Sequence, residues 1–155
     1  MRREDRAVND FSRQLEILRD CRVLHLALTD KAGLYSLPLS FGYVLKGEAL
    51  TLYIHSAPAG RKVAAMTRVC PVAFSMACGV EVLPGATPCQ TSCRYRSLTG
   101  TGYASLVEDT SEKCRALSAI LAQQTGEEAV FTEAMAQSVA VFRIRVDSLS
   151  GKARL

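Results

Sequence analysis

A chain of 155 residues with 48% hydrophobic and 22% charged side chains can bury one hydrophobic core, and it fits a single domain over residues 1–155. Its net charge of +4 is scattered along the chain without a long basic run, so we expect no nucleic-acid partner. No apolar stretch approaches the roughly 20 residues of a membrane-spanning helix, and the first residues lack the apolar segment of a signal peptide. We therefore expect a cytoplasmic protein with no membrane contact.

The first elements predicted are a helix and three strands joined by tight turns. We expect residues 1–8, which are charged, to be loose or packed on a partner. Asp10 can cap a helix that runs to about residue 20 and places Phe11, Leu15 and Leu18 on one face. Alternating strands are predicted at 23–29, 34–45 and 49–55, with turns at 30–33 and 46–48.

The second half of the chain predicts two further helices between strands. A helix from 61 to about 69 ends before Pro71, and Gly126 suits the end of a second helix. The predicted order is a helix at 61–69, a strand at 72–80, an exposed loop at 82–92, a strand at 94–107, a helix at 111–124, a short helical piece at 132–136, a strand at 139–146 and a polar tail at 148–155. Hairpin-connected strands with a few peripheral helices indicate a mainly β fold, a small antiparallel barrel.

Six cysteines occur in the chain, at positions 21, 70, 78, 89, 93 and 114. Without a secretory signal, reduced thiols are favoured over disulfides. Cys89 and Cys93 have no matching histidine or cysteine pair nearby, so we expect no metal site there. We interpret the six side chains as buried or loop thiols.

The segment 52–62 carries the most chemical information. A predicted strand leads through small residues into a helix that opens with Arg61 and Lys62. The N-terminal end of a helix is already partly positive, so two cations are unfavourable there unless an anion lies between them. Taken singly, Ser56 is an ordinary cap and the two cations are ordinary surface residues. Their joint occurrence with Gly60 favours a phosphate site.

Two strand segments contain residues that strands disfavour. Pro38 and Gly42 lie within the second strand, where either a flat ring against the backbone or an edge strand with a bulge would explain them. Gly100 and Gly102 leave one face of a later strand bare, either for a ligand or second subunit, or to let a barrel strand bend. The sequence leaves both pairs of alternatives open.

The chain has two histidines, for which different roles are expected. His55 lies where the third strand meets the phosphate turn, and its imidazole could hydrogen-bond a ring carbonyl, the phosphate or a substrate. His25 interrupts an apolar strand, and we expect it to be structural.

Several segments in a fixed order resemble one protein family. They are the opening Arg-Arg-Glu-Asp-Arg, residues 37–43, 52–57, 60–62 and 95–102, and the closing Ser-Gly-Lys. Together they resemble the flavin mononucleotide (FMN)-binding split-barrel superfamily related to pyridoxamine 5′-phosphate oxidase, most of all its nitroimidazole-resistance branch. The resemblance implies a homodimer of six-stranded antiparallel split barrels, with FMN at each subunit boundary.

Carried over by position, the resemblance also implies residue roles. Ser56, Arg61 and Lys62 would hold the FMN phosphate, and Ala57 and Gly60 belong to the same turn. Leu39, Ser40 and Phe41 would line the isoalloxazine ring, His55 would lie near the flavin and its small-molecule ligand as the candidate catalytic residue, and Ser97 would complete the pocket, from its own chain or the partner's.

Three functions remain open at this point. The first is an FMN-dependent oxidoreductase that passes electrons from a reduced donor such as NAD(P)H to a small oxidised acceptor such as a nitroaromatic. No G-x-G-x-x-G fingerprint occurs, so a nicotinamide would bind transiently. The second is a flavin-binding carrier or sensor without turnover, and the third a barrel for another phosphate compound or haem.

Overall fold

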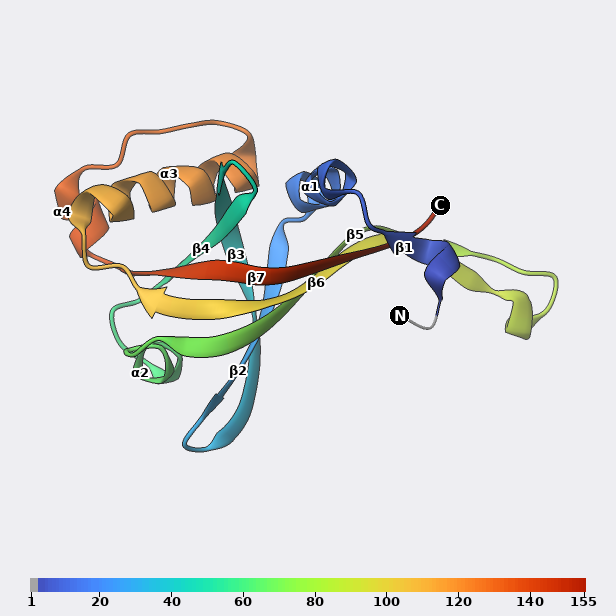
Figure 1. Cartoon of the computed structure of the whole chain (residues 1–155), viewed down its shortest axis with the longest axis horizontal. Coiled ribbons are helices and arrows are strands. Elements are labelled where there is room, and N and C mark those ends of the chain that lie inside the picture. The colour runs from blue at the N-terminus through green and yellow to red at the C-terminus, as the bar shows by residue number, and fades with distance from the viewer. Residues whose placement is uncertain (1–2) are drawn as a thin grey trace.

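The computed structural model describes residues 3–155, within which one antiparallel sheet is flanked by four α-helices (Figure 1). The elements are η1 (Glu4–Arg6), β1 (Ala7–Val8), α1 (Phe11–Asp20), β2 (Val23–Asp30), β3 (Gly33–Lys46), β4 (Ala49–Ser56), α2 (Arg61–Ala65), β5 (Cys70–Leu83), η2 (Pro88–Gln90), β6 (Ser92–Leu106), α3 (Thr110–Thr125), α4 (Glu133–Gln137) and β7 (Ala140–Arg154). None of the helices in this described part is long and apolar enough to cross a membrane.

The sheet closes on itself into a barrel-like ring. Its strand order is β1-β7-β4-β3-β2-β5-β6, and a further pairing of β6 with β7 joins the two ends. The sequence predicted six strands, whereas residues 3–155 form seven, because the two-residue β1 adds to β7. The prediction that residues 1–8 are loose or held by a partner is therefore wrong for Ala7 and Val8, which pair with Lys152 and Gly151.

Strand β7 is much longer than predicted. Residues 148–154, expected to form a polar tail, pair with β6 from Ser148 opposite Thr101 to Arg154 opposite Tyr95. Asp147 is skipped in this pairing, so the alternation of inward and outward side chains shifts by one residue there. The bulge interrupts the period of two that identifies a strand in a sequence, and this explains the error.

The main core fills the inside of the ring and extends under α1. Asp10 caps this helix by accepting a hydrogen bond from the Arg13 backbone N–H at 2.8 Å, as predicted. Gln14 donates from Nε2 to the Val8 carbonyl oxygen at 2.8 Å and so ties α1 to β1. The largest side chains buried in the core are Leu18, Leu24, Leu26, Phe41, Leu52, Ile54, Met66, Met76, Leu98, Phe142 and Ile144.

A second, smaller core lies outside the ring, between the sheet and helices α3 and α4. Val107, Ala116, Leu117, Ala136 and Val141 form it. Helix α3 contacts β3 at Gly42, where an added Cβ would lie 2.4 Å from backbone atoms of Ala119 and Ile120. The close approach of a helix therefore explains this glycine, and β3 is no edge strand because it pairs on both sides with β2 and β4.

Three predicted boundaries differ locally. Helix α2 is shorter than predicted and ends at Ala65. Strands β5 and β6 continue beyond the ring as a projecting hairpin (Figure 1), so the predicted loop shrinks to the residues between Leu83 and Ser92.

All six cysteines lie in the described residues and are free thiols, with Cys21 buried and Cys89 and Cys93 exposed.

Candidate functional site

The predicted phosphate turn joins β4 to α2. Ser56 ends the strand, and its hydroxyl donates a hydrogen bond to the carbonyl oxygen of Ala57 at 2.8 Å. Gly60 precedes the helix with φ at 129°, in the region that favours glycine over residues with a Cβ. Helix α2 has only five residues, so its macrodipole is weaker than that of the predicted helix at 61–69.

Arg61 already has an anionic partner within the chain. Its Nε lies 2.6 Å from Oδ2 of Asp30 and its Nη2 lies 3.0 Å from Oδ1, while the guanidinium stacks 4.2 Å above the centre of the Tyr35 ring. The hydrogen bond from Arg61 lowers the pKa of Asp30. Asp30 thus supplies a negative charge that was expected from a bound anion, and only the Nη1 side of the guanidinium remains for a ligand.

Lys62 is the cation of this turn that stays available. It is half-buried and forms no ion pair with another residue of the part described, 3–155. Burial lowers its pKa, and a charge that has lost solvent without gaining a partner is stabilised by a bound anion.

His55 shares the environment of Lys62. Partial desolvation and the positive charge of Lys62 lower the pKa of the imidazole, although the side chain as a whole is exposed. At pH 7 His55 is therefore neutral, with one nitrogen that donates and one that accepts a hydrogen bond.

Ser40 and His55 lie on the outer face of the ring. Their neighbours Phe41 and Ile54 are paired across β3 and β4 and fully buried inside, and the pairing of these strands ends there. Because side chains alternate along a strand, Ser40 and His55 point outward. Leu39 and Phe41 point inward instead, so only Ser40 of the predicted ring-binding trio exposes its side chain on this face, and the other two offer a ligand only their backbones.

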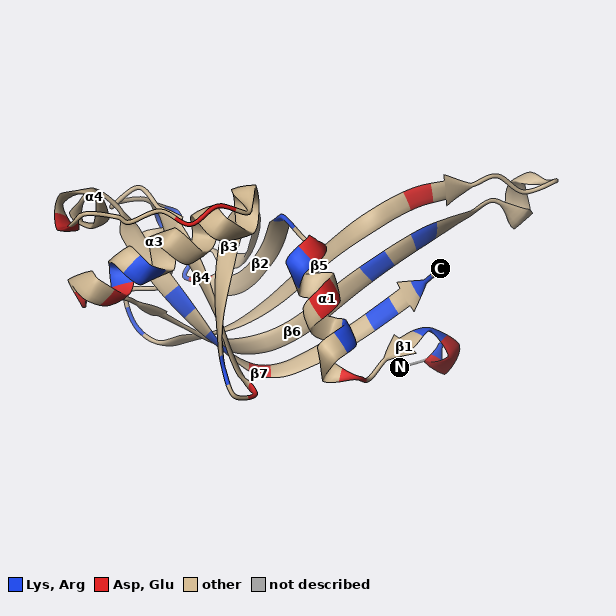
Figure 2. Ribbon diagram, turned by 90° about the horizontal axis from the view of Figure 1, so that it is seen from above, with Lys and Arg blue, Asp and Glu red and all other residues tan. Residues whose placement is uncertain are grey.

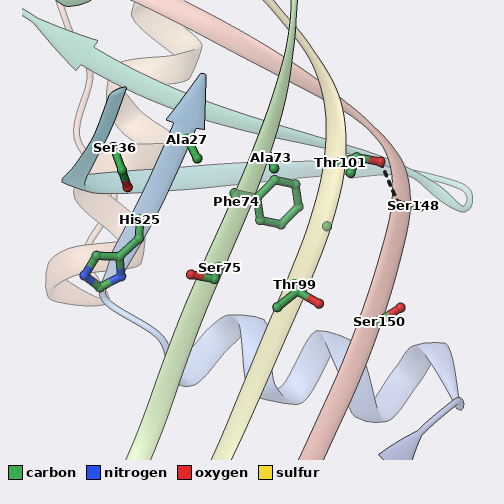
Figure 3. Close-up of a pocket in the computed structure, with 11 residues that line it drawn as sticks. His25, Ala27, Ser36, Ala73, Phe74, Ser75, Thr99, Thr101, Ser148 and Ser150 are labelled. Atoms are coloured by element: carbon green, nitrogen blue, oxygen red, sulfur yellow. Dashed lines mark hydrogen bonds between the residues drawn. The ribbon is translucent and has the colours of Figure 1, made fainter. Parts of the chain in front are cut away.

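The outer face of β2, β3, β5, β6 and β7 is lined by small side chains in two parallel rows (Figure 3). Each residue is directly opposite the next across the sheet. One row is His25, Ser75, Thr99 and Ser150, and the other is Ser36, Ala27, Ala73, Thr101 and Ser148. Together they line a cavity of about 400 Å³. We call this the outer-face cavity.

His25 was expected to be structural, but it is exposed at one end of this cavity. The alternation of Leu24, His25 and Leu26 in the sequence already indicated this position. Leu24 and Leu26 are buried on one side of β2, so His25 points outward. It lies opposite Pro38, two residues from Ser40 along β3. The cavity and the predicted ring-binding strand therefore share one face.

Ser97 lies further along β6 on the same outer face. It pairs with Lys152 in the register, and its Oγ donates to the carbonyl oxygen of Lys152 at 3.4 Å. The two glycines of β6 pack closely against other residues of the same chain. A Cβ on Gly100 would lie 2.3 Å from the Phe74 ring, and one on Gly102 would lie 2.1 Å from the carbonyl oxygen of Arg145. Close packing within the barrel explains both, without a ligand or second subunit.

The sequence matches the profile of the pyridoxamine 5′-phosphate oxidase family over residues 12–153. The chain belongs to this family. None of the curated proteins compared with it by sequence gives a significant match.

Solved structures show the same fold as this family member. A Bacteroides thetaiotaomicron protein named for 5-nitroimidazole antibiotic resistance is 28% identical and superposes with a TM-score of 0.79, over 94% of this chain and 85% of the other. An FAD- and heme-binding protein of Mycobacterium smegmatis reaches 0.79 at 21% identity, over 96% and 73% of the two chains. The flavocytochrome Anf3 of Azotobacter vinelandii reaches 0.78 at 19% identity, over 100% and 72%. The last two similarities concern the fold alone.

Proposed function

We propose that this protein binds a flavin, FMN in particular, and uses it to pass electrons from a reduced donor to a small oxidised acceptor. The observation that carries the proposal is membership of the pyridoxamine 5′-phosphate oxidase family over nearly the whole chain. Structural neighbours named as an FAD- and heme-binding protein and as a flavocytochrome support a flavin at the level of the fold. The chain's own residues then suggest where each part of the cofactor would bind.

The phosphate would lie at the turn between β4 and α2. Lys62 would make the main contact, because it is half-buried and forms no ion pair within residues 3–155. The Ser56 hydroxyl, the backbone N–H groups of Ala57 and Gly60, and the Nη1 side of Arg61 would add donors. Asp30 holds Arg61 in place, which lowers the entropic cost of using it.

The ring would lie along the outer face beyond the point where β3 and β4 separate. Ser40 would contact it through its side chain, and Leu39 and Phe41 would do so through their backbone. His55, neutral at pH 7, would hydrogen-bond the acceptor or move a proton to it. Bound flavin would supply the electron transfer, while these residues bind and orient the reactants.

We propose a homodimer with the cofactor at the subunit boundary. The two rows of the outer-face cavity contain no side chain bulkier than His25, so the backbone of a second copy could approach closely. Ser97 borders this face and would complete the pocket of its own or the partner chain.

A reduced nicotinamide would be the donor and a nitroaromatic the acceptor. The acceptor class is supported by the name of the 28% identical Bacteroides thetaiotaomicron protein. We place this activity in the cytoplasm, where six free thiols stay reduced.

An absorbance scan of the freshly purified protein tests the proposal. We expect a flavin spectrum, release of the chromophore on heating, and its identification as FMN or FAD by mass. A protein that stays colourless after incubation with both flavins contradicts flavin binding. A yellow protein that NAD(P)H never reduces and that never reduces a nitroaromatic is a carrier or sensor instead.

Two variants separate binding from turnover. Lys62→Ala should weaken FMN binding by about 1.5–3 kcal/mol, the value of a charge-assisted contact. Lys46→Ala, which removes an exposed cation at the end of β3, is the matched control. His55→Ala should lower turnover and leave most of the flavin bound. Loss of all flavin from it would make His55 a binding residue.

A further inference from the structure

A second cavity, of about 470 Å³, lies where the beginning and the end of the chain meet. Residues from η1, β1, the first turn of α1 and the end of β7 line it, and β1 pairs with β7 in its wall. Figure 2 shows basic segments on these elements, next to β1 and near the C-terminus. None of the cofactor contacts proposed above lies here.

Four arginines line this arginine cavity, namely Arg3, Arg6, Arg13 and Arg154. Asp5 contributes the one acidic side chain among the lining residues of the described chain. A terminal carboxylate on Leu155, which also lines the cavity, would still leave an excess of positive charge. Arg3, Arg6 and Arg13 come from the first residues of the chain, and the pairing of β1 with β7 brings Arg154 from the other end beside them despite the repulsion between like charges.

The carboxylate of Asp5 is paired with two of these arginines. Nε and Nη2 of Arg3 lie 2.8 and 2.7 Å from its two carboxylate oxygens, and Nε of Arg6 lies 3.8 Å from Oδ2. The hydrogen bond from Arg3 lowers the pKa of Asp5 to about 2, so the carboxylate stays ionised. Arg13 and Arg154 form no ion pair with any residue in 3–155.

The geometry suits a phosphate better than a single carboxylate. Guanidinium groups bind phosphate oxygens in pairs through a rigid fork of donors and keep their charge at any physiological pH. Several such groups around one space match a ligand with several charged oxygens. Ala7, Val8 and Ala153 add apolar wall, and the volume falls within the roughly 300–1,000 Å³ of small-molecule sites.

We propose that the arginine cavity binds the phosphate groups of a small organic phosphate of the nucleoside diphosphate class. Arg13 and Arg154 make the principal contacts, and Arg3 and Arg6, whose charge Asp5 partly offsets, add weaker ones. This site is separate from the turn at Lys62 and does not depend on the proposed flavin chemistry.

Calorimetric titration of the protein as purified, in phosphate-free buffer at low salt, tests this site with ADP and with inorganic pyrophosphate. We expect one ADP per chain, bound more tightly than pyrophosphate. The double variant Arg13→Gln with Arg154→Gln should lose at least about tenfold in affinity for both, since each tenfold corresponds to about 1.4 kcal/mol. Asp5→Asn should instead bind both more tightly, because it removes the competing carboxylate.

The matched control is Arg68→Gln, which removes an exposed cation between α2 and β5. Equal affinities of the double variant and this control overturn the proposal, as does the absence of heat with both probes. Binding of pyrophosphate without ADP excludes an organic ligand. A single-stranded oligonucleotide that binds more tightly than ADP, with loss in the double variant, makes the cavity part of a nucleic-acid surface and also overturns it. Flavin absorbance of the double variant should be unchanged. A loss of phosphate binding with unchanged absorbance then concerns the arginine cavity and not the cofactor site.

Discussion

Two regions of the outer face of the same sheet are built in opposite ways. Over β3, β4 and the first half of β7, helices α3 and α4 cover the sheet and bury a second apolar core. Over β2, β5, β6 and the second half of β7, the sheet carries alanines, serines and threonines around an open cavity. Apolar side chains form a buried core where the helices shield them, whereas the cavity of the uncovered region is lined mainly by small side chains.

The difference shows which region serves the fold and which is available for binding. In the covered region Tyr53 donates to Glu112 at 3.1 Å, and Arg143 lies 2.8 Å from the same carboxylate, so polar groups are paired as well as shielded. In the uncovered region the rows of small side chains make few such contacts, apart from Thr101 and Ser148 at 2.7 Å. Substitutions in the first region should accordingly lower the free energy of unfolding. Substitutions in the second region should weaken formation of the proposed dimer.

Gly42→Ala in the covered region should have the largest effect. Its Cβ would overlap backbone atoms of α3 at 2.4 Å, and neither backbone can move without disturbing the helix or the sheet. We expect a loss of about 3 kcal/mol in the free energy of unfolding, the upper end for overpacking. Urea denaturation followed by circular dichroism measures it. Ser40→Ala, on the same face of β3 but exposed, is the control, and an equal effect of the two would contradict the packing of α3 on Gly42.

Glu112→Gln should rank second. It removes the charge that Arg143 and the Tyr53 hydroxyl share in a half-buried setting, which leaves a partly desolvated guanidinium without its counter-charge. We expect a loss of about 2 kcal/mol, below the range for fully buried pairs because Arg143 keeps some solvent. Glu108→Gln, an exposed acid just before α3, should change the same measurement little. A loss as small as that of the control would mean that the pair contributes nothing to folding.

Thr99→Arg tests the uncovered region. The residue is exposed in the middle of one row, so the free energy of unfolding of the isolated chain should change by less than about 0.5 kcal/mol. Light scattering after size-exclusion chromatography should show monomers in place of the proposed dimer, with less flavin bound. Thr99→Ser should keep both. A Thr99→Arg dimer with full flavin content would place the subunit boundary elsewhere.

The smallest effect should be a pH dependence from His55. Its pKa is lowered in the folded state, so folding disfavours the protonated imidazole. The free energy of unfolding should therefore fall as the pH drops below about 6.5, the pKa of an unfolded histidine, towards the lower folded value. His55→Gln should flatten this part of the profile, measured by urea denaturation between pH 5 and 7.5. An unchanged slope would assign the dependence to other groups.

Local patterns were enough for most of the fold. The cap at Asp10, the turn at Gly33 and the positions of β2, β3, β4, β6 and α3 follow from capping, turn and periodicity signals that act within a few residues. The predicted site is less complete. Ser40 and His55 lie on the outer face near one end of β4, with Ser56 and Lys62 at the turn that follows, whereas the exposure of His25 at the outer-face cavity was not predicted, although its alternation with Leu24 and Leu26 indicates it.

By itself the sequence determined the mainly β class, the order of the elements and the pattern of the pyridoxamine 5′-phosphate oxidase family, since side-chain periodicity and backbone propensity are local properties. Only the tertiary structure decided that Asp30 neutralises Arg61, that α3 needs Gly42 and that the chain's end returns as a strand beside β6. Each of these depends on a segment far away along the chain. Which distant segments meet is settled when the whole core closes, and no short window of residues contains that information.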